Sequence, residues 1–152
     1  LPGRGWVAFG SDASGRAFLG IPETPAIELG VFITNDQDPW RRKRAAIRLG
    51  RALARMHAAG VNHPDLYAKH VLVDPETGEP TLLDWQRSRR APVVSFNARL
   101  RDLATLQATV SEQLVGDDLR RALLRSYLRE SRRRAGCLCF PSLRHLRRRG
   151  SW

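Results

Sequence analysis

Apolar residues recur at helical spacing across residues 40–59. The apolar positions are Ala46, Leu49, Leu53 and Met56. Asp38-Pro39 has the composition of a helix start and Gly60 that of a helix end. The opposite face is basic, and we expect it to be solvated in preference to forming a binding patch. Its cations are Arg41, Arg42, Lys43, Arg44, Arg48, Arg51 and Arg55.

Two short β-rich runs follow this predicted helix. They are Val71-Leu72-Val73 and Thr81-Leu82-Leu83, with Pro75-Glu76-Thr77-Gly78 between them. Proline, threonine and glycine in such a link are typical of a turn, so the pattern predicts a β-hairpin. The hairpin carries Asp84, which follows the second run, back beside the segment that precedes the first run.

The flanking segments are less regular. Residues 1–35 hold apolar runs separated by glycine-containing loops, which predicts strands and turns. Residues 87–92 are polar and predict a loop, where an arginine could bind negative groups of a substrate, with solvated charge as the alternative. Leucines at helical spacing then predict helices over 96–114 and 117–131. The core candidates there are Leu100, Leu103, Leu106, Leu114, Leu119, Leu123, Leu124 and Leu128.

Between the long helix and the hairpin lies the spacing His63-x-Asp65-x4-His70, and Asp84 ends the hairpin. Protein-kinase catalytic loops have the form His-Arg-Asp-x4-Asn, and a metal-binding Asp follows a short hairpin, so the positions coincide. In such a site a loop carboxylate orients or deprotonates the acceptor hydroxyl, and two further groups hold the metal that bridges the nucleotide phosphates. The spacing predicts Asp65 as the base and His70 and Asp84 as metal ligands. We also place His63 in the catalytic set, where we expect its ring nitrogens to support the loop. The alternative for the whole segment is a plain structural loop without catalytic function.

The segment from Asn62 to Arg87 resembles the lipopolysaccharide core kinase family (Kdo/WaaP and InaA type), a kinase-like group that phosphorylates sugars of the lipopolysaccharide inner core. Members often have a Tyr two residues after the catalytic Asp, and His where protein kinases have Asn. Tyr67 and His70 match that variant. The resemblance extends over residues 17–128.

This resemblance implies an α+β, protein-kinase-like fold. Residues 1–35 would be a remnant of the β-rich N-lobe with its hinge, residues 36–131 the helical C-lobe with the catalytic loop, and residues 132–152 a basic tail. It also implies ATP as the nucleotide, with Glu23 at the hinge and Tyr67 as cofactor-binding residues.

The segment Arg101-Asp102-Leu103 resembles the Lys/Arg-Asp-Leu of the family, in which a buried Asp braces the backbone of the catalytic loop. Asp102 is therefore expected to be structural.

Two departures qualify the resemblance. Pro64 replaces the usual Arg of the catalytic loop, and Trp85-Gln86 replaces Phe-Gly. The first makes control by a phosphorylated activation loop unexpected, and the second puts in doubt any in/out flip of the segment after Asp84.

The predicted metal is magnesium. Magnesium favours oxygen ligands, so an imidazole such as that of His70 would either act through water or indicate tolerance of manganese.

Charge is distributed unevenly along the chain of 152 residues, whose net charge is +11. Residues 1–119 are nearly balanced, whereas residues 120–152 hold 11 Arg and a single acid. The tail could be solvated, bind anionic lipid or form a nucleic-acid arm. Cys is too scarce for a disulfide framework. The sequence has neither a secretory apolar stretch nor a run of 18 apolar residues, so we expect no signal peptide and no transmembrane helix in these residues. We therefore expect a cytoplasmic protein, peripheral on the inner membrane if the tail binds lipid.

Together these features predict a kinase that moves the γ-phosphate of ATP to a sugar hydroxyl of the lipopolysaccharide inner core. The alternatives are a pseudokinase-like binding module, an aminoglycoside-type small-molecule kinase and a basic nucleic-acid-binding module. The acceptor sugar and its hydroxyl stay open. The chain begins with Leu and has no glycine-rich loop with its paired lysine, so we expect a piece of a longer chain in which those parts lie upstream.

Overall fold

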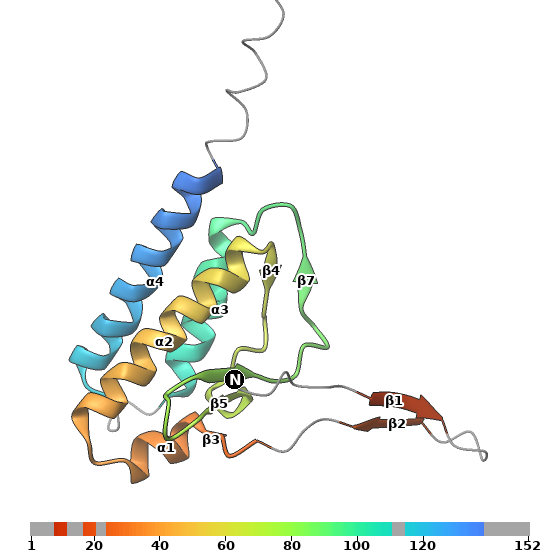
Figure 1. The fold of residues 1–152 in the computed structure, drawn as a ribbon. Coiled ribbons are helices and arrows are strands. Elements are labelled where there is room, and N and C mark those ends of the chain that lie inside the picture. The colour runs from red at the N-terminus through yellow and green to blue at the C-terminus, as the bar shows by residue number, and fades with distance from the viewer. Residues whose placement is uncertain (1–7, 12–16, 21–23, 111–114, 139–152) are drawn as a thin grey trace, which may run out of the picture.

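The computed structural model describes residues 8–11, 17–20, 24–110 and 115–138 (Figure 1). Helices and short strands are both present in this α+β chain. The elements in chain order are β1 (Ala8–Ser11), β2 (Ala17–Gly20), β3 (Ile27–Glu28), α1 (Leu29–Asn35), α2 (Pro39–Ala58), β4 (Val61–Asn62), the 3-10 turn η1 (Ala68–His70), β5 (Val71–Val73), β6 (Pro80–Leu82), β7 (Arg89–Arg90), α3 (Phe96–Thr109) and α4 (Asp117–Leu138).

The central element is α2, which supports both the catalytic segment and α4. The side chain of Asp38 caps its start by accepting a hydrogen bond from the Trp40 amide at 2.8 Å, and Pro39 occupies the first turn, as the sequence predicts. Its apolar face is buried, with Leu53 fully enclosed. Helix α4 lies alongside α2 (Figure 1) and approaches so closely at Gly50 that a Cβ there would lie 2.3 Å from the Leu123 carbonyl oxygen. Only glycine fits this crossing.

The predicted hairpin is confirmed. β5 pairs antiparallel with β6 and also with β3, which gives a three-stranded sheet in the order β3-β5-β6. The carboxylate of Asp74 closes the turn by accepting hydrogen bonds from the amides of Glu76 and Thr77 at 2.8 and 2.9 Å. The Thr77 amide bond is the main reason that the pKa of Asp74 lies below its usual range.

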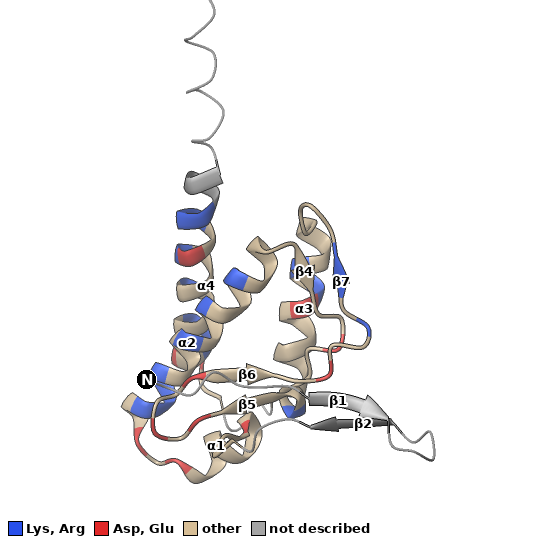
Figure 2. Ribbon diagram, turned by 45° about the vertical axis from the view of Figure 1, so that its right-hand side comes forward, with Lys and Arg blue, Asp and Glu red and all other residues tan. Residues whose placement is uncertain are grey.

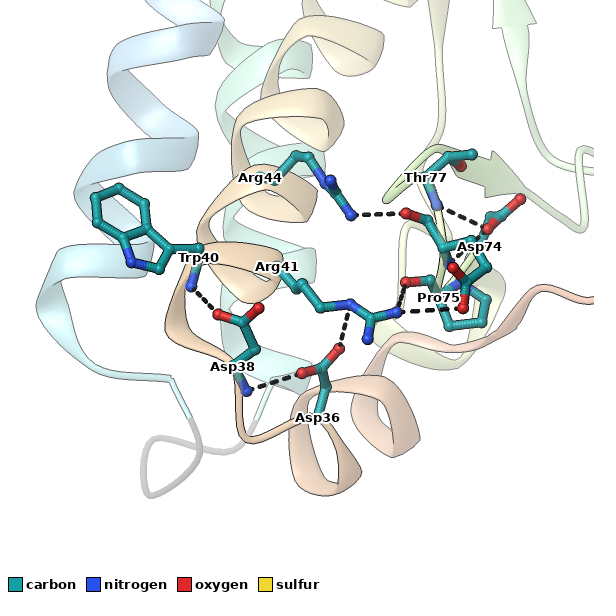
Figure 3. Close-up of polar contacts among 9 residues, drawn as sticks. Asp36, Asp38, Trp40, Arg41, Arg44, Asp74, Pro75 and Thr77 are labelled. Atoms are coloured by element: carbon teal, nitrogen blue, oxygen red, sulfur yellow. Dashed lines mark hydrogen bonds and ion pairs between the residues drawn. The ribbon is translucent and has the colours of Figure 1, made fainter.

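The hairpin turn is fastened to the first turns of α2 (Figure 3). Arg41 donates to the Pro75 carbonyl oxygen and pairs with Asp36, and Arg44 donates to the Glu76 carbonyl oxygen at 2.7 Å. Arg48 pairs with Glu79 of the same turn. On this part of α2 the basic face therefore also has a structural role, because its partly exposed arginines hold the hairpin in place.

Three local predictions are corrected. Residues 1–35 were expected to contain strands and turns alone, but residues 29–35 form α1, because Leu29, Phe32 and Ile33 share one face that is buried in the core. In the expected loop at 87–92, Arg89 and Arg90 pair with β4 as the short strand β7. The helix predicted over 96–114 ends at Thr109, and residues 111–114 lie outside the described part of the chain.

The predicted leucine core is correct in part. Leu106 and Leu119 are buried, and Leu103 and Leu123 pack against the core. Three others are exposed, and Leu114 lies outside the described residues. The exposed ones are Leu100, Leu124 and Leu128.

Helix α4 runs without a break across the expected boundary at residues 131 and 132. Within the described ranges, no helix is long and apolar enough to cross a membrane.

Candidate active site

Asp65 lies in the loop between β4 and η1. Tight backbone hydrogen bonds shape this loop, from the Leu66 amide to the His63 carbonyl oxygen at 3.1 Å and from the Tyr67 amide to the Asp65 carbonyl oxygen at 2.7 Å. The Asp65 residue is 8% exposed, and one carboxylate oxygen accepts a hydrogen bond from Arg87 at 2.9 Å. The Arg87 side chain is itself 73% exposed, so solvent reaches the pair from the arginine side.

His70 and Asp84 come together at the base of the hairpin. Leu83 donates its amide to the His70 carbonyl oxygen at 2.8 Å, which sets the next residue, Asp84, beside His70. The His70 Nε2 atom lies 3.7 Å from the Asp84 carboxylate. Asp84 has a φ of 58°, in the left-handed region, and this backbone conformation turns the chain at the end of the hairpin. The sequence spacing grouped His70 with Asp84, and the two side chains lie beside each other in the structure.

The tautomer of His70 follows from its second contact. Its Nδ1 lies 2.8 Å from the carbonyl oxygen of Asp65, which can only accept, so Nδ1 carries a proton. In the neutral ring Nε2 then presents its lone pair toward the carboxylate of Asp84. Two electron-rich groups that face each other in this way suit a shared cation.

Few protein side chains at this site could bind a metal ion. No group of three or more His, Cys, Asp and Glu side chains able to hold a metal occurs among the described residues. Magnesium in phosphotransferases is typically bound by one or two protein carboxylates together with substrate phosphates and water. His70 and Asp84, whose side chains are 17% and 40% exposed, fit a site that the nucleotide would complete.

His63 links the two halves of the site. Its backbone amide donates to Asp102 at 2.6 Å, and its Nε2 donates to the carbonyl oxygen of Leu83 at 2.9 Å. The ring also packs on Trp85, with 4.9 Å between centroids. His63 therefore connects the loop that holds Asp65 to the residue that precedes Asp84.

A buried polar chain underlies this loop. The family resemblance led us to expect a buried Asp102 beneath the loop, but the sequence did not reveal the contacts with His57 and Tyr127. The Asp102 carboxylate, fully buried in α3, accepts from the His63 amide and from His57 Nε2 at 3.1 Å. Because His57 Nε2 donates, the neutral ring accepts at Nδ1 from the hydroxyl of Tyr127 in α4 at 2.8 Å. His57, on the buried face of a predicted helix, was the available sign of such a contact.

The cofactor-binding predictions have different outcomes. Glu23 lies outside the described residues. The Tyr67 ring stands edge-on to the His70 ring, 5.5 Å away, and borders a cavity of about 500 Å³ beside α1. Its contact with a nucleotide stays a prediction.

These elements define an α+β chain of the protein-kinase-like class, in which a helix, a loop and a hairpin present the candidate carboxylates. The model of the family "Lipopolysaccharide kinase (Kdo/WaaP)" matches residues 13–127, and the chain belongs to that family. The family resemblance drawn from the sequence is thereby confirmed.

Two known proteins resemble this chain, and the solved structure among them supports the family assignment. A solved structure described as WaaP in complex with acyl carrier protein superposes with a TM-score of 0.62 at 26% identity, over 88% of this chain and 63% of that one. The protein kinase MCK1 of Saccharomyces cerevisiae is 33% identical over 72 residues, which cover 46% of this chain and 19% of the yeast kinase. The chain thus spans less than two thirds of each of these relatives.

Proposed function

We propose that the protein to which this chain belongs transfers the γ-phosphate of ATP to a sugar hydroxyl of the lipopolysaccharide inner core. The observation that carries this proposal is the hydrogen bond from His70 Nδ1 to the Asp65 carbonyl oxygen, because it joins the candidate base to the His70 and Asp84 pair in one site. Membership of the lipopolysaccharide kinase family supports the reaction class and the class of acceptor.

Each residue has a distinct role in this proposal. Asp65 orients or deprotonates the acceptor hydroxyl, and Asp84 and His70 hold Mg²⁺ or Mn²⁺. When bound, the cation neutralises charge on the nucleotide phosphates. His63 and Asp102 keep the loop in place through the contacts described above. The glycine-rich loop and lysine are expected upstream of this chain.

Arg87 holds the candidate base in this structure. Its guanidinium donates to one carboxylate oxygen of Asp65 at 2.9 Å. Because most of its side chain is exposed, Arg87 can turn toward solvent and bind a negative group of the acceptor or a phosphate in a bidentate manner. The substrate would then replace the carboxylate as the partner of Arg87.

The test compares the isolated chain, the chain extended upstream and its Asp65→Asn variant, each with ATP, Mg²⁺ or Mn²⁺ and a core-sugar acceptor. The extended chain should transfer phosphate, the isolated chain should not, and Asp65→Asn should lower turnover by about two to four orders of magnitude without unfolding the protein. Transfer within a few-fold of the parent by Asp65→Asn would contradict the role of Asp65.

The same assay separates the alternatives. ATP binding without transfer would favour a pseudokinase-like module, and transfer to an aminoglycoside instead of a core sugar would favour a small-molecule kinase. Salt-sensitive binding to RNA or DNA with no transfer would favour a nucleic-acid-binding module.

A second candidate function, binding of an acyl carrier protein, is favoured by one observation. An apolar cavity of about 370 Å³ lies among α1, α2, α3 and α4, lined by Phe32, Leu49, Leu103 and Leu123 among others. The WaaP structure that this chain resembles was solved with an acyl carrier protein. An acyl chain carried by such a partner would suit a cavity with little polar surface. Stronger binding of the acylated than of the unacylated carrier would support this function, and equal binding would refute it.

A further inference from the structure

A cleft that is separate from the two cavities described above lies between α2 and α4, and none of the candidate active-site residues lines it. Its volume is about 590 Å³, and α2 and α4 supply all of its lining residues. Six cations and two acids line it; they are Lys43, Arg51, Arg121, Arg125, Arg129, Arg133, Asp118 and Glu130. Figure 2 shows lysine and arginine along both helices, whereas acidic residues gather mainly in the turns around α1 and the hairpin. The cleft is therefore a concentrated positive site.

Among the residues that the structure describes, most of these cations have no ion-pair partner. The acid at Glu130 is already shared by Arg55 and Arg134, at 3.3 and 3.0 Å, and Arg121 pairs with the exposed Asp117 at 3.2 Å. Within the part of the chain that the structure describes, no ion pair engages the other cleft cations. These are Lys43, Arg51, Arg125, Arg129 and Arg133.

The spacing of the arginines along α4 intensifies the charge. Arg121, Arg125, Arg129 and Arg133 follow one another at intervals of four residues. Like charges at this spacing lie on neighbouring turns and repel each other, which destabilises the helix. An anion bound across successive turns would relieve this repulsion.

The close crossing at Gly50 gives the site its concave form. Because glycine lets α4 approach the backbone of α2, the neighbouring cation Arg51 lines the same cleft as Arg125 and Arg129. Guanidinium groups from two helices can therefore converge on one anion. Planar guanidinium groups bind the oxygens of phosphates and carboxylates in a bidentate geometry, so the cleft suits an oxyanion such as a phosphate.

The surroundings of the cleft favour a membrane surface as the source of phosphate. Trp40 is 75% exposed at the start of α2, and Lys43 of the cleft lies over its ring at 5.7 Å. Leu128 is 44% exposed on α4, between Arg125 and Arg129. Exposed tryptophan and leucine beside arginines are the combination that binds the interfacial region of a bilayer.

We propose that the cleft between α2 and α4 binds the phosphate headgroups of anionic phospholipids and so docks the protein on a membrane. This inference goes beyond the proposed function, since it concerns separate residues and requires neither ATP nor turnover. It also differs from lipid binding by the tail, because all of the cleft cations except Arg133 precede residue 132.

The test measures binding of the whole chain to vesicles of phosphatidylcholine, with and without phosphatidylglycerol. Arg125→Gln/Arg129→Gln removes two cleft cations, and Arg101→Gln/Arg132→Gln is a matched control, since both of its sites are exposed and neither lines the cleft. An arginine near an anionic surface contributes about fivefold to binding, so the cleft variant should bind about thirtyfold more weakly. The control should lose much less, because its cations lie outside the cleft.

Three results would overturn the proposal. An equal loss in the control variant would mean that net charge alone, including that of the tail, governs binding. Unchanged vesicle binding by the cleft variant would exclude the cleft as the docking surface. Loss of RNA or acyl carrier protein binding with vesicle binding retained would assign the cleft to another partner. Phosphate-transfer assays of the extended chain report separately on the active site, so failure of one proposal leaves the other intact.

Discussion

Two histidine–aspartate pairs in this protein have the same chemical groups and opposite environments. In the first, His57 and Asp102 are both fully buried, and 3.1 Å separates Nε2 from the carboxylate. In the second, His70 and Asp84 are partly exposed and 3.7 Å apart. The buried pair makes a direct hydrogen bond, whereas the exposed pair leaves a gap.

The partners of each ring explain the difference. Both nitrogens of His57 have protein partners, Tyr127 on one side and Asp102 on the other, so its ring has no nitrogen left for a ligand. His70 uses Nδ1 on the Asp65 carbonyl and turns its remaining lone pair toward Asp84. The buried pair can only hold structure, and the open pair can accept a ligand.

The largest expected effect comes from the open pair. Asp84→Ala in the upstream-extended protein should remove metal-dependent nucleotide binding and lower turnover by about three orders of magnitude or more, because no neutral side chain replaces a carboxylate between cation and phosphates. Nucleotide binding titrated with Mg²⁺ and Mn²⁺ measures this directly. The denaturation midpoint should fall only slightly, because Asp84 is not in the core and the sole structural cost is that alanine tolerates its left-handed backbone less well than aspartate.

His70 provides the graded comparison at the same pair. His70→Asn restores the usual kinase ligand and should be milder than His70→Ala. Equal loss in the two variants would indicate that the imidazole has some other task.

The buried pair should show the reverse pattern, with stability changed first. Asp102→Ala leaves the His63 amide and His57 Nε2 without an acceptor in the core, at about 1–3 kcal/mol for each group, so unfolding free energy should fall by about 2–5 kcal/mol. Urea denaturation measures this loss. Asp102→Asn is the matched control, since its amide oxygen can still accept both bonds, and it should cost less. A stability loss no larger in the Ala variant would contradict this bonding scheme.

The smallest effect is expected at the outer end of the buried chain. Tyr127→Phe removes the hydroxyl that donates to His57 and should lower unfolding free energy by about 1 kcal/mol. Burial raises the pKa of Tyr127 above its ordinary value of 10.0. The folded state therefore favours the neutral phenol, and its contribution is present below pH 10 and lost as pH rises through the raised pKa. Denaturation midpoints measured across this alkaline range should fall more steeply in the parent than in Tyr127→Phe.

The features that the sequence predicted correctly are those that depend on short-range patterns. The hairpin and its turn, the helix that precedes the loop and the meeting of His70 with Asp84 all depend on residues within one local segment. Helix α1 was missed because Val31, Ile33 and Thr34 favour strands, although Leu29, Phe32 and Ile33 already had helical spacing. Here tertiary packing outweighed propensity.

Contacts between distant segments could not be predicted in the same way. Tyr127 lies 70 positions from His57, and Arg87 lies 22 from Asp65, so no local pattern pairs them. The exposed Leu124 and Leu128 show a related limit, because helical spacing marks candidate faces without telling which face meets a neighbour. Which face α4 buries is settled by where α2 lies.

At position 84 the backbone conformation and the proposed chemistry require different residues. A φ of 58° suits glycine, and aspartate adopts it at a cost on the order of 1–3 kcal/mol. Glycine has no carboxylate to offer a cation, so the residue that the turn prefers is not the residue that the proposed chemistry requires. Position 84 is thus a point of trade-off between stability and activity, where variants selected for thermal robustness would tend to lose catalysis.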